Sequence, residues 1–147
     1  MALSNIQFEG TVKFGTTAST ASVASQVHKC ELKRTFDAVE IRGTFASSRN
    51  TTKPGNFQDE LTVAFDNDGT ATGSTSMAAL IHQVAMSATP SAVLYFEFIQ
   101  DSAAVSTDNL RFSGTVSVLE AMKGGVVGEL RSQEITFPVL TLTMASV

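Results

Sequence analysis

A period of two in the last third of the chain, between Asn109 and Met144, places the strongest constraint on the fold. Apolar residues and Gly114 alternate with polar residues at Leu110, Phe112, Gly114, Val116 and Val118. The pattern is interrupted by Gly124, Gly125 and Gly128, and resumes after Glu134 at Ile135, Phe137 and Val139. Because successive side chains of a strand point to opposite faces, the pattern predicts two strands with one apolar face each, joined by a glycine-bearing connection.

The preceding chain repeats this period in shorter segments. Further strands are predicted over residues 8–14, 27–36, 39–45 and 61–65. Asp37 lies between the second and third of these and permits a tight connection. Residues 92–100 are apolar almost throughout, which is typical of a central strand with both faces covered. We expect one face to meet the core and the other to meet the helix or another subunit.

The period changes to that of a helix at about residues 75–87. Met77, Leu80, Ile81 and Val84 follow the i, i+3, i+4, i+7 spacing of an apolar helix face. Ser74 or Thr75 can cap its start, and Pro90 requires that it has ended by Thr89. The sequence therefore predicts a mainly β fold, a β-sandwich or curved antiparallel sheets with one flanking helix. At 147 residues, the whole of 1–147 is most simply one domain.

The longest break between predicted strands covers residues 47–58. It contains the turn pair Pro54-Gly55 and is longer than the usual two to five residues of a hairpin loop. Arg49, Lys53 and Phe57 combine charge with one aromatic side chain, a mixture suited to interfaces. The segment is predicted to be a projecting contact loop, with a surface excursion of no function as the alternative.

Residues suited to catalysis or metal binding are few. The chain has two histidines and a single cysteine, Cys30, which is predicted to be a small inward-facing residue with His28 on the same strand face. No third residue to orient such a pair is visible. A calcium-binding turn at 66–70 lacks the closing acidic residue of an EF-hand, and the adjacent Asp59 and Glu60 face opposite sides of a strand. We therefore expect no enzyme, no cofactor and no metal.

The charge distribution argues against a site that neutralises phosphates. The net charge is −4 and the ten basic residues are scattered, with only Lys29, Lys33 and Arg34 near one another, as on a solvated strand face. The first residues lack a basic stretch followed by an apolar run, and no apolar run reaches the ~18 residues that span a bilayer. The chain is therefore expected to be made in a cytosol.

The C-terminal strand pair resembles the C-terminal part of the major tail tube proteins of long-tailed bacteriophages. The resemblance lies in Ser113–Val118 (SGTVSV), the turn Gly124–Glu129 (GGVVGE) and the strand Ser132–Pro138. It implies a tail-tube-like β-sandwich with a flanking helix, hexameric rings stacked into a hollow tube, and a lumen that conducts DNA during ejection without specific binding. The implied location is the virion tail, after synthesis in the host cytoplasm. The implied partners are further copies of the chain, tape measure, tail terminator and distal tail proteins, and no membrane.

Within this family, the corresponding hairpin loop projects from the ring. The resemblance thus implies that the 47–58 segment, with Arg49, Lys53 and Phe57, bonds one ring to the next. A lumen of net negative or neutral charge is also expected, because phosphates gripped by Lys or Arg would slow passage. Candidates to line it are Glu9, Glu31, Glu40, Glu97 and Glu134. Two alternatives stay open: another virion protein, such as a capsid decoration protein or a contractile-tail inner tube, and a monomeric ligand-binding β-sandwich.

Overall fold

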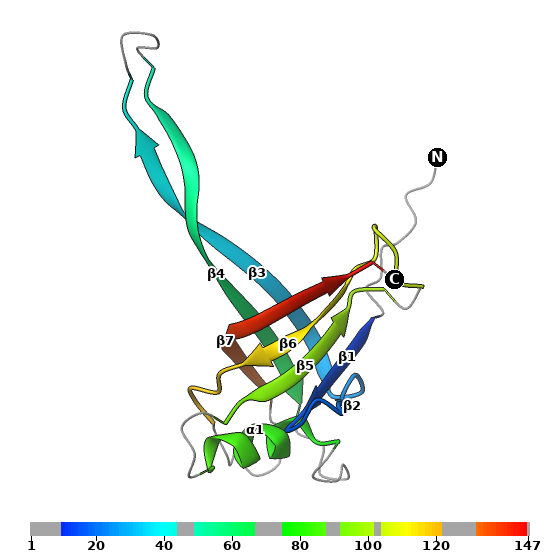
Figure 1. Cartoon of the computed structure of the whole chain (residues 1–147). Coiled ribbons are helices and arrows are strands. Elements are labelled where there is room, and N and C mark those ends of the chain that lie inside the picture. Colours follow the sequence, from blue (N-terminus) through cyan, green and yellow to red (C-terminus); the bar gives the residue numbers. More distant parts are fainter. Residues whose placement is uncertain are drawn as a thin grey trace.

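The computed structural model describes residues 10–43, 49–66, 75–87, 92–101, 104–121 and 132–146, and it is mainly β with one helix (Figure 1). The elements in chain order are β1 (Thr11–Gly15), β2 (Ala21–Ser22), β3 (Val27–Ile41), β4 (Thr51–Asp66), α1 (Met77–Ala85), β5 (Leu94–Ile99), β6 (Arg111–Val116) and β7 (Ser132–Ala145). The predicted fold class, antiparallel strands with a single flanking helix, is confirmed.

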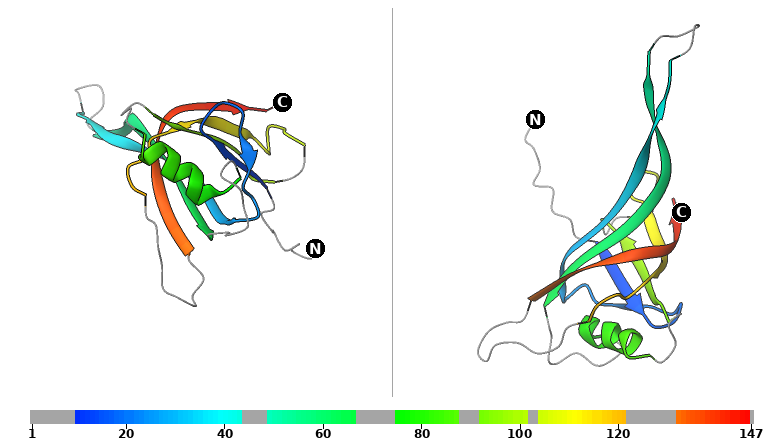
Figure 2. Two further views of the ribbon diagram at one scale, coloured as in Figure 1. Left: turned by 90° about the horizontal axis from the view of Figure 1, so that it is seen from below. Right: turned by 90° about the vertical axis from the view of Figure 1, so that its left-hand side faces the viewer.

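The seven strands of the described residues belong to one antiparallel sheet in the order β2-β1-β5-β6-β7-β4-β3. The sheet folds back on itself because β7 is shared between its two halves (Figure 2). The first part of β7 pairs with β4, ending at Glu60↔Pro138, and the second part pairs with β6 from Val116↔Val139 onward. A register shift between Thr115 and Val116 lies at this corner, where a bulge increases the local bend.

The core lies between the two halves of the folded sheet. The inward-facing residues of β4 alternate as the sequence predicts, and Leu61, Val63 and Phe65 are fully buried. Phe137 of β7 lies opposite Phe14 of β1, with 6.5 Å between their ring centroids. The first part of β7 and β1 belong to different halves and are not paired with each other, so this contact shows that the halves pack face to face, as in a sandwich. The predicted pairing of the two C-terminal strands is also confirmed, since β6 and β7 are hydrogen-bonded neighbours.

Helix α1 covers the lower end of the folded sheet (Figure 1). The four residues predicted to form its apolar face are all buried. The predicted cap is wrong by at least one residue. Ser76 is the N-cap, and its Oγ accepts a hydrogen bond from the Ala79 amide. Gln26, which is itself buried, explains how the start of the helix is held: its Oε1 accepts from the Met77 amide at 2.9 Å and its Nε2 donates to the Thr75 carbonyl at 2.6 Å.

Strands β3 and β4 are longer than the sequence predicted. The tight connection expected at Asp37 is wrong: β3 continues to Ile41, and the ladder only shifts register between Phe36 and Ala38. The predicted 47–58 loop is wrong over Thr51 to Gln58, which belongs to β4. Pro54 is tolerated there because that part of β4 pairs with β3 alone, so its missing N–H breaks no second ladder.

Strand β5 was predicted to have both faces covered, and this is confirmed for one face only. Leu94 and Phe96 on its inner face are buried in the core, as expected. Tyr95, Glu97 and Ile99 on the other face are half-buried and are not covered completely. The expectation that another subunit covers this face stays a prediction.

Candidate functional site

The outer parts of β3 and β4 form a two-stranded arm that leaves the body of the protein. β4 pairs with β7 only from Glu60 to Asp66, whereas its pairing with β3 continues to Ile41↔Thr51 (Figure 1). We call residues 36–41 and 51–57 the arm. At about 3.3 Å per residue, its six-residue β3 part extends about 20 Å. Its side chains are exposed throughout, apart from Gly55.

The arm carries apolar side chains that a free monomer would normally bury. Eight large hydrophobic residues of the described chain are exposed, and four of them lie on the arm: Phe36, Val39, Ile41 and Phe57. The exposed fractions of Phe36 and Phe57 are 50% and 54%. Clustering of this kind, as opposed to scattered single residues, marks an interaction surface.

An aromatic and charged cluster fixes the base of the arm. Phe36 and Phe57 lie opposite each other in the ladder, with centroids 6.0 Å apart in an edge-to-face arrangement. The Arg34 guanidinium lies 4.1 Å from the centre of the Phe57 ring. It also donates two hydrogen bonds to the Asp59 carboxylate, of 2.7 and 2.9 Å, which raise the pKa of Arg34. Because Arg34 is held on both sides, the Phe57 ring has a defined orientation on an exposed surface.

The structure places the three predicted interface residues on the same projection but not in one cluster. Arg49 precedes β4 and is exposed, Lys53 lies opposite Val39 in the outer part of the arm, and Phe57 belongs to the cluster at its base. Sequence reasoning missed Phe36, Val39 and Ile41 as interface residues and placed them in two ordinary strands, 27–36 and 39–45. Nothing in their alternation separates an exposed arm from a buried strand, because both have a period of two.

The edges of β3 and β4 also leave backbone hydrogen-bonding groups accessible to another chain. β3 is the last strand at one end of the sheet order, and among the described residues nothing pairs with its outer edge over Val27–Ile41. β4 is likewise unpaired on the side away from β3 between Thr51 and Asp59. Long open edges are templates for strand addition, and proteins normally shorten or cover them. Such edges suit a subunit that assembles.

The carboxylates predicted to line a lumen lie on different surfaces. Glu134 accepts a hydrogen bond from Lys29 at 3.0 Å, and Glu31 lies 4.0 Å from the same Lys29 nitrogen. The hydrogen bond and charge of Glu134, followed by the charge of Glu31, raise the Lys29 pKa. Glu97 is on the outer face of β5, Glu40 is on the arm, and Glu9 lies outside the described residues. Of the four described carboxylates, the structure therefore brings only Glu31 and Glu134 together.

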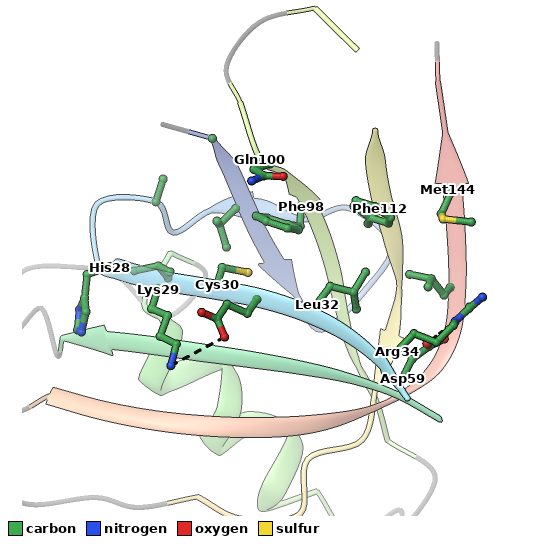
Figure 3. A pocket seen from close by; sticks show the side chains of 16 residues that line it. His28, Lys29, Cys30, Leu32, Arg34, Asp59, Phe98, Gln100, Phe112 and Met144 are labelled. Carbon is green, nitrogen blue, oxygen red and sulfur yellow. Dashed lines mark hydrogen bonds and ion pairs between the residues drawn. The ribbon is translucent and has the colours of Figure 1, made fainter. Parts of the chain in front are cut away.

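The residues that could carry other chemistry do not converge. The expectation that His28 and Cys30 share a strand face is wrong, because the ladder shifts register between Val27 and Lys29 and the two side chains point apart (Figure 3). His28 Nδ1 instead lies 3.8 Å from an oxygen of Asp66. Burial, with the nearby Glu31 charge, raises the pKa of the Cys30 thiol to about 12, the opposite of an activated nucleophile.

The described part of the chain contains no group of three or more metal-ligating side chains. Residues 67–70, which belong to the calcium-binding turn considered from the sequence, lie outside the described residues. Among the described residues, no helix has the length and apolar character needed to cross a membrane.

Comparison with known proteins found a similarity of fold but no match of sequence. No protein-family model matches the sequence, and no curated protein matches it. The fold is similar to that of a chain in the cryo-EM structure of the anti-feeding prophage baseplate, 6-fold symmetrised. The TM-score is 0.59 and the sequence identity 10%, and the match covers 99% of this chain and 98% of the other. The two chains therefore share a fold, at a sequence identity of only 10%.

Proposed function

We propose that this chain is a structural subunit of a phage-tail-like tube, in which copies form hexameric rings that stack around a lumen. The observation that carries the proposal is the arm, with half of the described exposed large hydrophobic residues and two open strand edges. The full-length fold similarity to a chain of a prophage baseplate supports it, as does the resemblance of the C-terminal strand pair to tail tube proteins. The proposed location is the tail of the virion.

The arm makes the contact between rings. It extends away from the packed body, so it reaches a neighbouring ring without disturbing the core of its own subunit (Figure 1). Phe57, oriented by Arg34 and Phe36, is the aromatic anchor. Val39 and Ile41 extend the apolar surface outward, and Lys53 adds a charge at the outer part.

The outer face of β1, β5, β6 and the second part of β7 is the best candidate for the lumen wall. One cross-strand row on this face reads Lys13, Glu97, Ser113, Thr143. Opposite charges in register offset each other, and hydroxyl groups fill the rest of the row. A wall of this composition is close to neutral, so duplex DNA would pass without the counterion release that accompanies tight binding. Tight, salt-sensitive binding of duplex DNA by the subunit would contradict this role.

A second candidate function is a ring at the end of the tail, close to or within a baseplate, or the inner tube of a contractile tail. The fold neighbour favours it, because that structure is a baseplate. The two candidates differ in their product. A tube subunit polymerises without limit, whereas an end ring closes and stops. In either case the other tail proteins named above are the expected partners.

Electron microscopy of the purified chain tests the proposal. Rings or long tubes are expected, and a particle that stays at 15.5 kDa under all conditions would contradict it. The informative variant replaces residues 36–57 by Asn-Gly, which closes the hairpin at the Thr35↔Gln58 pair with a two-residue turn. It keeps the Arg34–Asp59 pair and should fold and form single rings that do not stack. Normal tubes from this variant would exclude the arm from ring stacking.

A further inference from the structure

The outer part of the arm is basic, although the chain as a whole is acidic. The segment 40–53 carries Arg42, Arg49 and Lys53 against the single carboxylate of Glu40, a net charge of +2. Since the whole chain has a net charge of −4, the remaining residues carry −6. All four charged residues are exposed, and none of the three cations forms an ion pair with another described residue. These cations are therefore available to a partner.

The same surface carries apolar side chains, which favours a protein partner over a nucleic acid. Lys53 lies opposite Val39 in the ladder, and Ile41 is two residues further out. The exposed fractions of Val39 and Ile41 are 47% and 41%. A phosphate backbone would bind the cations but leave these side chains in water, whereas a protein surface can cover apolar groups and pair the charges together. The arm therefore fits a protein surface that is acidic where the two meet.

The opposite end of the same two strands is acidic. β4 runs from Thr51 on the arm to Asp66, about 50 Å at 3.3 Å per residue, and the first part of β7 lies beside that far end (Figure 1). Glu134 lies opposite Ala64 there, and the side chains of Asp66 and Glu134 are 39% and 56% exposed.

A third carboxylate, Glu31, belongs to the same end. Lys29 Nζ lies 3.0 Å from Glu134 and 4.0 Å from Glu31, so it neutralises one of the three negative charges of Glu31, Asp66 and Glu134. Two negative charges remain, since His28 is neutral at pH 7. We call these three carboxylates the acidic end.

We propose that the outer part of the arm of one copy docks on the acidic end of the next copy. The inference rests on the proposed function, because it names the surface that the arm meets on the neighbouring ring. Complementary surfaces at opposite ends of one chain produce a head-to-tail contact, which can repeat without limit along a stack. The charges also select this orientation, because arm against arm and acidic end against acidic end are both repulsive.

Reversing the charges on each surface separately tests the contact. The arm variant carries Arg49→Glu and Lys53→Glu, and the end variant carries Asp66→Lys and Glu134→Lys. An exposed ion pair changes an equilibrium roughly 1.4–5-fold, and two pairs on each of six arms make roughly twelve in the proposed junction. Each variant should therefore form single rings in electron microscopy and stack at least about fiftyfold more weakly than the wild type.

Restored complementarity separates loss of this contact from loss of folding. Rings of the two variants should stack into tubes when mixed, because every arm then meets an oppositely charged end. A chain with all four reversals keeps the net charge of −4 and should form tubes by itself. If neither the mixture nor this chain stacks while the wild type forms tubes, the docking surface is wrong and the tube function stands.

The remaining outcomes are equally decisive. Lys33→Glu with Glu60→Lys reverses a cross-strand pair in the middle of the two strands and should stack like the wild type, and loss of stacking there would overturn the assignment to the two ends. A wild type that forms neither rings nor tubes would contradict the proposed function, and this contact with it. Salt-sensitive binding of duplex DNA that is lost in the arm variant would overturn the proposal in favour of a nucleic-acid partner.

Discussion

Replacing Phe57 by Ala separates the role of the arm in the subunit from its proposed role in assembly. Phe57 is 54% exposed, so only about half of the roughly 1.5–3 kcal/mol of a fully buried Phe is at stake within the subunit. The edge-to-face contact with Phe36 and the Arg34 guanidinium each add about 0.5–1 kcal/mol. We expect the free energy of unfolding to fall by about 2–3.5 kcal/mol, mostly through local opening of the arm.

The same replacement should have a larger effect on the proposed stacking of rings. If assembly buries the exposed half of Phe57, its removal costs about 1 kcal/mol per contact. In the proposed hexameric ring this adds up to about 6 kcal/mol per junction, roughly four orders of magnitude in the stacking constant. The critical concentration for tube formation, measured by sedimentation, should therefore rise by more than the loss of subunit stability in urea unfolding can explain.

Two controls make the comparison specific. Met86→Ala removes a side chain that is more exposed than Phe57, at 74%, but lies at the C-terminal end of α1, and should change neither measurement. Phe137→Ala opens a cavity in the core and should cost about 3–5 kcal/mol of subunit stability. Tubes of the Phe57→Ala variant that form at the wild-type critical concentration would refute the assignment of Phe57 to the ring contact.

Three further predictions concern the subunit. Phe96→Ala should lower the free energy of urea unfolding by about 3–5 kcal/mol, and an unchanged midpoint would place Phe96 outside the core. Gln26→Ala removes the side chain that binds the Met77 amide and the Thr75 carbonyl, and should cost about 1–3 kcal/mol with a loss of helical circular dichroism; full retention of both would contradict this anchoring role. The folded pKa of Cys30, about 12, exceeds its ordinary 9.0, so folding stability should be complete below pH 9 and fall above it by up to about 1.4 kcal/mol per pH unit. The Cys30→Ala variant should lose less stability between pH 9 and 11, and parallel profiles would contradict burial of the thiol.

The elements that bury one face could be predicted from the sequence. Burial imposes a period on the chain, and the periods of helix α1 and of β4 near Phe65 are visible because one side of each packs into the core. The start of the helix was misplaced because Gln26, distant in sequence, supplies the hydrogen bonds that a nearby cap would otherwise provide. Local cap signals carry no information about such a partner.

The arm could not be predicted, and the reason is physical. Asp37, Pro54 and Gly55 are turn-forming residues, and in a compact domain they would end strands. Here Asp37 faces a register shift, and Pro54 lies on an edge that has no second ladder. Gly55 leaves room for the Val39 side chain, since a Cβ atom there would lie 2.7 Å from Val39 Cγ2 unless that side chain moved. Each of these three residues is accommodated in a twisted two-stranded ribbon. Sequence signals alone do not distinguish such a ribbon from a turn.

The energetics of the arm connect its fold to its function. A two-stranded hairpin is marginally stable in water on its own, because it has no sheet or helix against which to bury a face. The cluster at the base anchors the arm, but beyond it Val39 and Ile41 remain exposed and opposite polar partners, Lys53 and Thr51. Such an arm gains its missing burial only from another molecule. Its ordering and the contact between subunits should therefore be one coupled step, so that a substitution weakening the arm weakens assembly before it weakens the fold.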